Sequence, residues 1–356
     1  MNFAIVRYLI GWMLGIESIF LLLPALTAVI YGEAELPAYL TAAAISLAGA
    51  ALLCHRKPKN TRFYAREGYV TVALCWLVLA VIGALPFVLS REIPFFIDAL
   101  FETVSGFTTT GATILGDVEA LSHASMLWRC LTHWVGGMGV LVFMLIVLPL
   151  AGGQTIFLMR AESPGPAVSK MSPHMRDTAT ILYAIYFGLT VLQMILLLIG
   201  GMPLFDAICV SLGTAGTGGF GNWNDSIAHY NSAYLQNVIT VFMILFGINF
   251  SAYFLILTRK FRQAFRIEEI RVYLGVIFVF AGLIAFNVRP MFGSLRESFH
   301  HALFQVASII TTTGFSTVDF DRWPTFSRAL LVLLMFIGAC AGSTGGGMKC
   351  SRILLL

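Results

Sequence analysis

Long apolar runs alternate with short polar segments along almost the whole chain. A membrane-spanning helix needs about 20 apolar residues, so these runs predict spans. The expected spans are 3–30, which Pro24 breaks near its end, 37–54, 68–89, 125–150, 179–199, 233–257, 272–288 and a last span that begins near residue 326. Shorter apolar stretches at 97–105, 205–213 and 301–308 predict half-length helices between the spans. The fold class expected is an all-α polytopic membrane protein.

Each half-length helix runs into the same Thr-x-Gly motif, and the three copies align without a gap. The motif glycines are Gly111, Gly219 and Gly314, which we call the first, second and third motif. Threonine stands two residues before each glycine and alanine stands twelve residues before it, at Thr109, Thr217 and Thr312 and at Ala99, Ala207 and Ala302. A unit that recurs usually builds a site together with its copies, so the three motifs are interpreted as one site.

The chemistry of the repeated motif suits a cation pathway. Irregular backbone at membrane depth is tolerated only where it is buried in protein or lines a water-filled cavity. A half-helix whose C-terminus points into the membrane presents the negative end of its dipole, and rings of carbonyl oxygens can replace the hydration shell of an alkali cation. The candidate pore-lining residues are Thr109, Thr110, Gly111, Thr217, Gly218, Gly219, Thr312, Thr313 and Gly314. The alternative is that these small residues serve helix packing.

Three acidic residues lie in or near the short helices, namely Asp98, Glu102 and Asp206. Two interpretations stay open for them. They either attract cations into an outer vestibule or serve at helix starts and interfaces.

A second signal is a glycine-rich stretch partway along the last span. It contains Gly338, Gly342, Ser343, Thr344, Gly345, Gly346 and Gly347 and is followed by Lys349. This many glycines disfavour a helix, and we therefore expect an irregular loop in the middle of the span, below the motifs. The functional hypothesis is that this loop acts as a gate. The alternative is a close-packed helix contact. Lys349 either repels cations in the pore or extends to the cytoplasmic surface. Ser343 has no histidine or acidic partner placed for it, so an enzyme is not expected.

Composition and charge support the membrane assignment. Hydrophobic residues make up 58% of the chain and charged residues 11%, with a mean hydropathy of +0.85. Of the 22 Lys and Arg residues, 16 fall at the N-terminus, at the end of the chain or in loops that would then be cytoplasmic. This bias places the N-terminus in the cytoplasm and the motifs on the outer side. It also explains the net charge of +4 without a nucleic-acid partner. The six cysteines are scattered singly and are expected to be buried thiols.

The motif segments at 101–113, 217–220, 312–317 and 338–349, together with 134–139 and 160–165, resemble the bacterial TrkH potassium-uptake subunits of the Trk/Ktr/HKT superfamily. The resemblance implies potassium as the transported ion, no organic cofactor, a homodimer in the bacterial inner membrane and a cytoplasmic nucleotide-binding regulatory subunit. It implies two extra N-terminal helices followed by four repeats around one central ion pathway. Each repeat consists of a helix, a re-entrant pore helix and a second helix. It also implies selectivity at the motif glycines and a gate in the glycine-rich stretch. Serine at the first motif glycine accompanies sodium permeation in this family, so Gly111 favours potassium.

This resemblance divides the chain into 1–60 as the N-terminal helix pair and 61–160, 161–266 and 267–356 as the first, second and third pore repeats. The motif glycines are 108 and 95 residues apart, so a fourth is expected on the order of 100 residues after Gly314, beyond Leu356. We therefore expect a truncated form of a longer protein that lacks the fourth repeat. The competing hypothesis is a non-conducting membrane scaffold that only dimerises or binds a cytoplasmic partner. Passive flux and coupling to protons or sodium both stay open.

Overall fold

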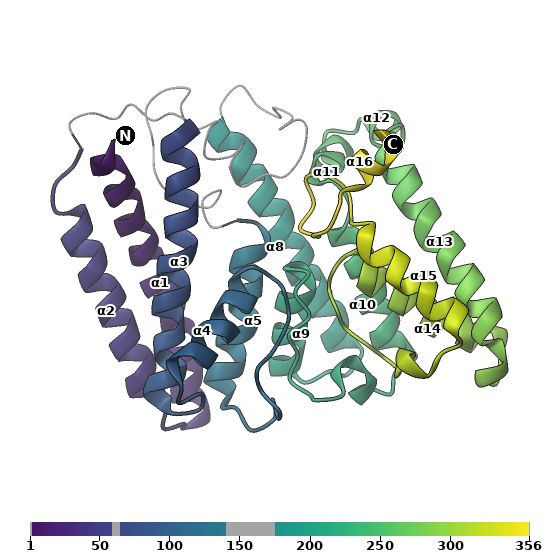
Figure 1. The fold of residues 1–356 in the computed structure, drawn as a ribbon, viewed down its shortest axis with the longest axis horizontal. Coiled ribbons are helices and arrows are strands. Elements are labelled where there is room, and N and C mark those ends of the chain that lie inside the picture. The colour runs from purple at the N-terminus through teal and green to yellow at the C-terminus, as the bar shows by residue number, and fades with distance from the viewer. Residues whose placement is uncertain (1, 59–64, 140–174, 356) are drawn as a thin grey trace. The chain divides into compact units, whose positions relative to one another are not determined.

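The computed structural model describes residues 2–58, 65–139 and 175–355 (Figure 1). Helices build the fold of these residues, and the one pairing of strand type among them is an isolated bridge between Ile337 and Met348. The chain forms two compact units. Of the described residues, the first unit comprises 2–58, 65–139 and 175–180, and the second comprises 181–355. The all-α expectation is therefore confirmed.

The first unit contains three long helices, one short helix and one of intermediate length. They are α1 (Phe3–Tyr31), α2 (Leu36–Cys54), α3 (Ala65–Ser90), α4 (Phe96–Phe107) and α5 (His123–Gly137). The three long helices are apolar enough to cross a membrane. Large apolar side chains such as Leu52 and Leu77 are exposed on them, as expected for surfaces that face lipid rather than water. The span expected at 125–150 is described as far as residue 139, and its remainder lies outside the described residues.

Small residues and serines bring α1 and α2 together. A Cβ at Gly11 would lie 2.6 Å from the Cys54 sulfur, so only glycine allows this approach. Ser46 donates to the Leu14 carbonyl at 2.8 Å, and Ser18 donates to the Ala43 carbonyl at 3.0 Å. Small residues and hydroxyl hydrogen bonds are the usual means of helix association in a membrane. The N-terminal helices are therefore a tightly packed pair.

The expectation that Pro24 breaks the first span is wrong. Helix α1 continues through Pro24 to Tyr31. Proline at position 24 removes the amide that would donate to the carbonyl four residues earlier, at Phe20. Membrane helices tolerate such a proline because neighbouring groups can satisfy the freed carbonyl.

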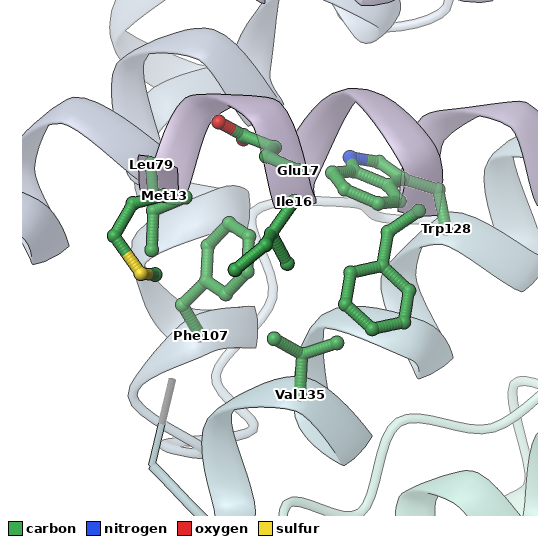
Figure 2. A pocket seen from close by; sticks show the side chains of 8 residues that line it. Met13, Ile16, Glu17, Leu79, Phe107, Trp128 and Val135 are labelled. Carbon is green, nitrogen blue, oxygen red and sulfur yellow. The ribbon is translucent and has the colours of Figure 1, made fainter. Parts of the chain in front are cut away.

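The interior of the first unit closes around the end of α4 (Figure 2). The Phe107 and Trp128 rings meet edge to face at 6.0 Å. A small pocket beside them is lined by Met13, Ile16, Glu17, Phe20, Leu79, Phe107, Trp128 and Val135. Glu17 is the one ionisable residue in this lining, and its side chain is almost fully buried. The pocket has room for no more than about one water molecule.

The second unit repeats the alternation of long and short helices. Its helices are α8 (Met175–Ile199), which the unit shares from residue 181 onward, α9 (Leu204–Ala215), α10 (Ala233–Phe246), α11 (Phe250–Leu257), α12 (Phe261–Phe265), α13 (Glu268–Val288), α14 (Leu295–Ile310), α15 (Thr325–Phe336) and α16 (Cys350–Leu355). Short 3₁₀ turns lie at Ser226–His229, Arg289–Met291 and Phe320–Arg322. One apolar core joins α13, α14 and α15, and another joins α8, α9, α10 and α14.

Two helix boundaries differ from the sequence-based expectation. The span expected at 233–257 is not one helix, because α10 and α11 meet at 94° across Gly247, Ile248 and Asn249. Helix α14 begins at Leu295 rather than at residue 301. Its first turn is capped by Ser294, whose hydroxyl accepts from the Glu297 amide at 3.1 Å. A serine followed three residues later by glutamate is a helix-start signal that apolar content alone does not register.

Candidate functional site

All three Thr-x-Gly motifs have the same unusual backbone. The threonine two residues before the glycine has a left-handed φ, of 54° at Thr109, 54° at Thr217 and 59° at Thr312. The motif glycines that follow have φ of 74°, 79° and 87°. Positive φ is an outlier for a β-branched residue, and such strain persists only where the surroundings impose it. The sequence repeat is therefore a conformational repeat as well.

Hydrogen bonds explain how each short helix reaches this conformation. The amide that follows the left-handed threonine donates back to the carbonyl five residues earlier, as in a Schellman helix ending. The three equivalent bonds are Thr110 to Ser105 at 2.9 Å, Gly218 to Gly213 at 3.1 Å and Thr313 to Ser308 at 2.9 Å. Glycine normally occupies the left-handed position of such an ending. Threonine there keeps a hydroxyl at the helix end at the cost of backbone strain.

A buried ion pair holds the chain that leaves the first motif. The Arg129 Nε donates to the Glu102 Oε1 at 2.7 Å, and both side chains are at most 2% exposed. Glu102 also accepts from the Thr113 hydroxyl and the Ile114 amide at 3.0 Å each. A carboxylate with these partners is a structural brace, and Glu102 lies in the interior of α4 rather than at a helix start. Asp98 lies half-buried in the first turn of α4, where a negative charge suits the helix dipole.

In the second unit an equivalent brace recurs at other positions. The residue thirteen before the motif glycine contacts the residue three after it. Asp206 accepts from the Asn222 amide at 2.6 Å, and His301 Nδ1 lies 2.9 Å from the Thr317 hydroxyl. Asp206 also accepts from the Tyr230 hydroxyl at 2.7 Å. Burial and the Asp206 carboxylate raise the pKa of Tyr230 well above its usual value, which keeps it a donor. Asp206 is therefore a satisfied structural carboxylate.

The second and third motifs lie against each other. A Cβ at Gly219 would fall 1.9 Å from the Thr313 carbonyl oxygen, so no residue but glycine fits there. Among the described residues no group of three or more His, Cys, Asp and Glu side chains could hold a metal ion. What these motifs offer a cation is neutral oxygen from backbone carbonyls and threonine hydroxyls, which suits an alkali ion.

The glycine-rich stretch is irregular, as predicted, and the alternative of a continuous helix contact is wrong. Residues 338–349, which we call the glycine-rich loop, connect α15 to α16 without helical structure. The Thr217 hydroxyl donates to the Thr344 carbonyl at 3.1 Å. The Gly346 amide donates to the Thr312 hydroxyl at 2.8 Å. Both left-handed threonines of this unit thus bond the loop through their side chains.

The break between α10 and α11 faces the same loop. A broken helix exposes carbonyls and amides that need partners. The loop supplies them through the Thr344 hydroxyl to the Phe246 carbonyl at 3.2 Å, the Cys340 amide to the Gly247 carbonyl at 3.0 Å and the Phe250 amide to the Gly342 carbonyl at 3.0 Å. Two residues signal this break in the sequence. Gly247 follows the last residue of α10, and Asn249 caps α11 by accepting from the Ser251 amide at 2.8 Å.

Lys349 does not extend to the surface. Its side chain is buried, and the ammonium donates to the carbonyl of Gly345 within its own loop. The alternative that Lys349 reaches the cytoplasmic surface is therefore wrong. The cysteines are free, and five of them are buried while Cys54 is partly exposed.

Known proteins resemble this chain over its full length. The family model described as "TrkH: Cation transport protein" matches residues 38–281 and 277–356. The Trk system potassium uptake protein TrkH of Salmonella typhimurium is 38% identical over 363 residues, covering 100% of this chain and 75% of that protein. The protein of the same name from Escherichia coli K12 is 37% identical with the same coverage. The crystal structure of the potassium transporter TrkH from Vibrio parahaemolyticus matches with a TM-score of 0.87 and 32% identity, covering 100% of this chain and 74% of that one.

Proposed function

Because this chain belongs to the TrkH family of cation transport proteins, we propose that it takes up potassium ions across the bacterial cytoplasmic membrane. Its relatives are named potassium uptake proteins, and the family is one of transporters rather than enzymes. The chain is a multi-pass membrane protein, with five helices in its described part long and apolar enough to span and a sixth if the bent α10–α11 pair counts as one.

The selectivity filter of this proposal consists of the three Thr-x-Gly motifs. One observation carries it, namely the same left-handed threonine and glycine backbone in all three copies. Three strained segments of one conformation are hard to explain by packing alone, because each costs free energy that an ordinary loop would avoid. The oxygens that would contact the ion are those of residues 109–111, 217–219 and 312–314.

The gate of this proposal is the glycine-rich loop. Its support is two hydrogen bonds between the loop and the motifs: the Thr217 hydroxyl donates to the Thr344 carbonyl, and the Thr312 hydroxyl accepts from the Gly346 amide. Residues 1–60 would form the N-terminal helix pair, and 61–160, 161–266 and 267–356 would form the successive pore repeats.

Partners and orientation complete the proposal. We infer a homodimer, a cytoplasmic nucleotide-binding regulatory subunit and a cytoplasmic N-terminus. The support for the orientation is the excess of Lys and Arg in the loops assigned to the cytoplasm.

Rubidium uptake tests the proposed function. The chain would be produced in cells that lack their own potassium-uptake systems, and its presence in the membrane checked by immunoblot. We expect rubidium uptake that potassium inhibits and an equal concentration of sodium does not. Stable membrane-inserted protein with uptake equal to that of empty-vector cells would refute the proposal and favour a scaffold.

Replacing Gly111 by Ser tests the first motif directly. Serine at a φ of 74° carries strain of about 1–3 kcal/mol, and moving the neighbouring carbonyls relieves it. We therefore expect the preference for potassium over sodium, measured by competition against rubidium uptake, to fall about tenfold. Gly116→Ser is the matched control, because a Cβ at Gly116 meets nothing within 4 Å. Equal selectivity of the two variants would remove Gly111 from the filter.

A further inference from the structure

One carboxylate oxygen holds both ends of the glycine-rich loop. Glu269 Oε1 accepts from the Ala341 amide at 2.7 Å and from the Ser351 amide at 3.0 Å. Ala341 precedes the cluster of glycines, and Ser351 lies in the first turn of α16. The nine residues between these two donors, 342–350, contain most of the loop. A single acceptor on another helix therefore holds the loop both near its beginning, at Ala341, and where the chain enters α16, at Ser351.

Glu269 is placed to do this by α13. It lies in the first turn of that helix and is 9% exposed. An acidic residue in a first turn ordinarily serves its own helix N-terminus. The recorded acceptor contacts of Glu269 go instead to the loop, and the N-cap residue Ile267 makes no side-chain cap. The carboxylate is thus committed to a segment 72 residues away in sequence.

The same face of α13 also supports the broken span. Tyr273 lies four residues after Glu269, so the two side chains project from one face of the helix. The Tyr273 hydroxyl donates to the Ile244 carbonyl at 3.2 Å, near the end of α10. Since α10 and α11 bond the loop at their break, α13 contacts the loop directly through Glu269 and indirectly through Tyr273. The first two turns of α13 therefore hold the loop in position.

We propose that Glu269 is a positioning residue that clasps the glycine-rich loop closed and couples its movement to the start of α13. The clasp rests on the proposed gating role of the loop. A buried amide that loses its hydrogen-bond partner is costly, so both loop amides depend on an acceptor oxygen at this position. Release of the loop therefore requires that the Glu269 carboxylate moves away from the Ala341 and Ser351 amides.

Cysteines already present report on the clasp. Cys340 and Cys350 each adjoin one of the two donors and are buried. Membranes containing the full chain would be treated with N-ethylmaleimide, and alkylation of each cysteine measured over time by peptide mass spectrometry. Cys209, buried in α9, reports on general unfolding in the same sample.

Four variants separate the effects of the charge, the length and the acceptor oxygen of the Glu269 side chain. Glu269→Ala removes the acceptor, and we expect about tenfold faster alkylation of Cys340 and Cys350 with Cys209 unchanged. Glu269→Asp keeps the charge but is one methylene shorter, so it should behave like Glu269→Ala. Glu269→Gln keeps a carbonyl oxygen at the same reach and should protect both thiols nearly as well as glutamate. Glu268→Ala removes a neighbouring exposed carboxylate and should change nothing.

The clasp also predicts a transport effect. Glu269→Ala should raise basal rubidium uptake, while Glu269→Gln should leave it near that of the unmodified chain. Equal protection of Cys340 in Glu269→Ala and Glu268→Ala would overturn the clasp. Faster alkylation of Cys209 together with Cys340 would overturn it as well, since Glu269 would then serve only general stability. Alkylation is measured without transport, so a chain that takes up no rubidium refutes the proposed function while the thiols still decide the clasp.

Discussion

Threonine in a left-handed conformation is the residue-scale feature that distinguishes the motifs. Glycine would occupy the same φ with less strain. In the second unit the hydroxyl that glycine would lack bonds the glycine-rich loop, as donor from Thr217 and as acceptor at Thr312. The strain at these residues is therefore offset by contacts that link two segments of the proposed ion pathway.

The buried ion pair behind the first motif leads to a stability prediction. Replacing Glu102 by Gln leaves the Arg129 guanidinium buried without its counter-charge, which typically costs about 3–5 kcal/mol. We expect a clear drop in the thermal unfolding midpoint in detergent. Asp98→Asn, in the first turn of the same helix and half-buried, should shift the midpoint only slightly. A double change of Glu102 and Arg129 to Met should recover part of the loss, and failure to recover would show that the pair is not the cause.

Replacing Glu17 should not lower the thermal unfolding midpoint, in contrast to replacing Glu102. Its side chain is 2% exposed, and neither carboxylate oxygen has a hydrogen-bond partner among the residues that the structure describes. Burying a polar group without a partner costs about 1–3 kcal/mol by protein mutational data. Glu17→Leu is therefore expected to leave the unfolding midpoint unchanged or to raise it.

The adjacent Ser18→Ala is the control for that change. It removes the hydrogen bond to the Ala43 carbonyl and should lower the midpoint by the equivalent of about 1 kcal/mol. A large destabilisation by Glu17→Leu would mean that the carboxylate has a role that its surroundings in the first unit do not reveal.

At the scale of elements, two interrupted helices satisfy each other. The break after α10 and the loop after α15 each expose backbone groups that would be costly inside a membrane. Three hydrogen bonds between them remove most of that cost. Neither interruption is explained alone, and the stability of each depends on the other.

The approach of the second and third motifs gives an element-scale prediction. Gly219→Ala would place a Cβ 1.9 Å from the Thr313 carbonyl oxygen at a φ of 79°. Relieving this overlap must separate the two motifs, so we expect loss of rubidium uptake and a destabilisation of at least about 1–3 kcal/mol. Gly221→Ala is the control, because its nearest neighbour is a ring atom of Phe315 at 3.8 Å and its φ is ordinary. Similar uptake by both variants would contradict the close approach.

For the whole molecule, the sequence predicted the pattern of long and short helices well. The expected spans at 37–54, 68–89 and 272–288 agree with α2, α3 and α13 to within a few residues. The misses have local causes. Helix α1 continues through Pro24 because a membrane helix tolerates a proline that would break a helix in water. The apolar run at 233–257 conceals a break because its residues are hydrophobic on both sides of the bend.

Potassium binding should stabilise the whole protein. A ligand that binds only the folded chain stabilises it by about 2.7 kcal/mol at 100 times its dissociation constant. We expect a higher unfolding midpoint in potassium chloride than in sodium or choline chloride at equal ionic strength. Gly219→Ala should abolish the difference. Equal midpoints of the unmodified protein in all three salts would argue against a potassium-selective site.

The sequence by itself determined the features that depend on local pattern. Apolar length specified the spans, spacing specified the three motifs, and clustered glycines specified an irregular loop, because each follows from neighbours along the chain. Only the tertiary structure decided the partners. Thr217 and Thr344 are 127 residues apart, and Glu269 and Ala341 are 72 apart. Which buried polar group satisfies which depends on where the helices pack, so only the structure shows that Glu269 is the acceptor for two amides of the loop region.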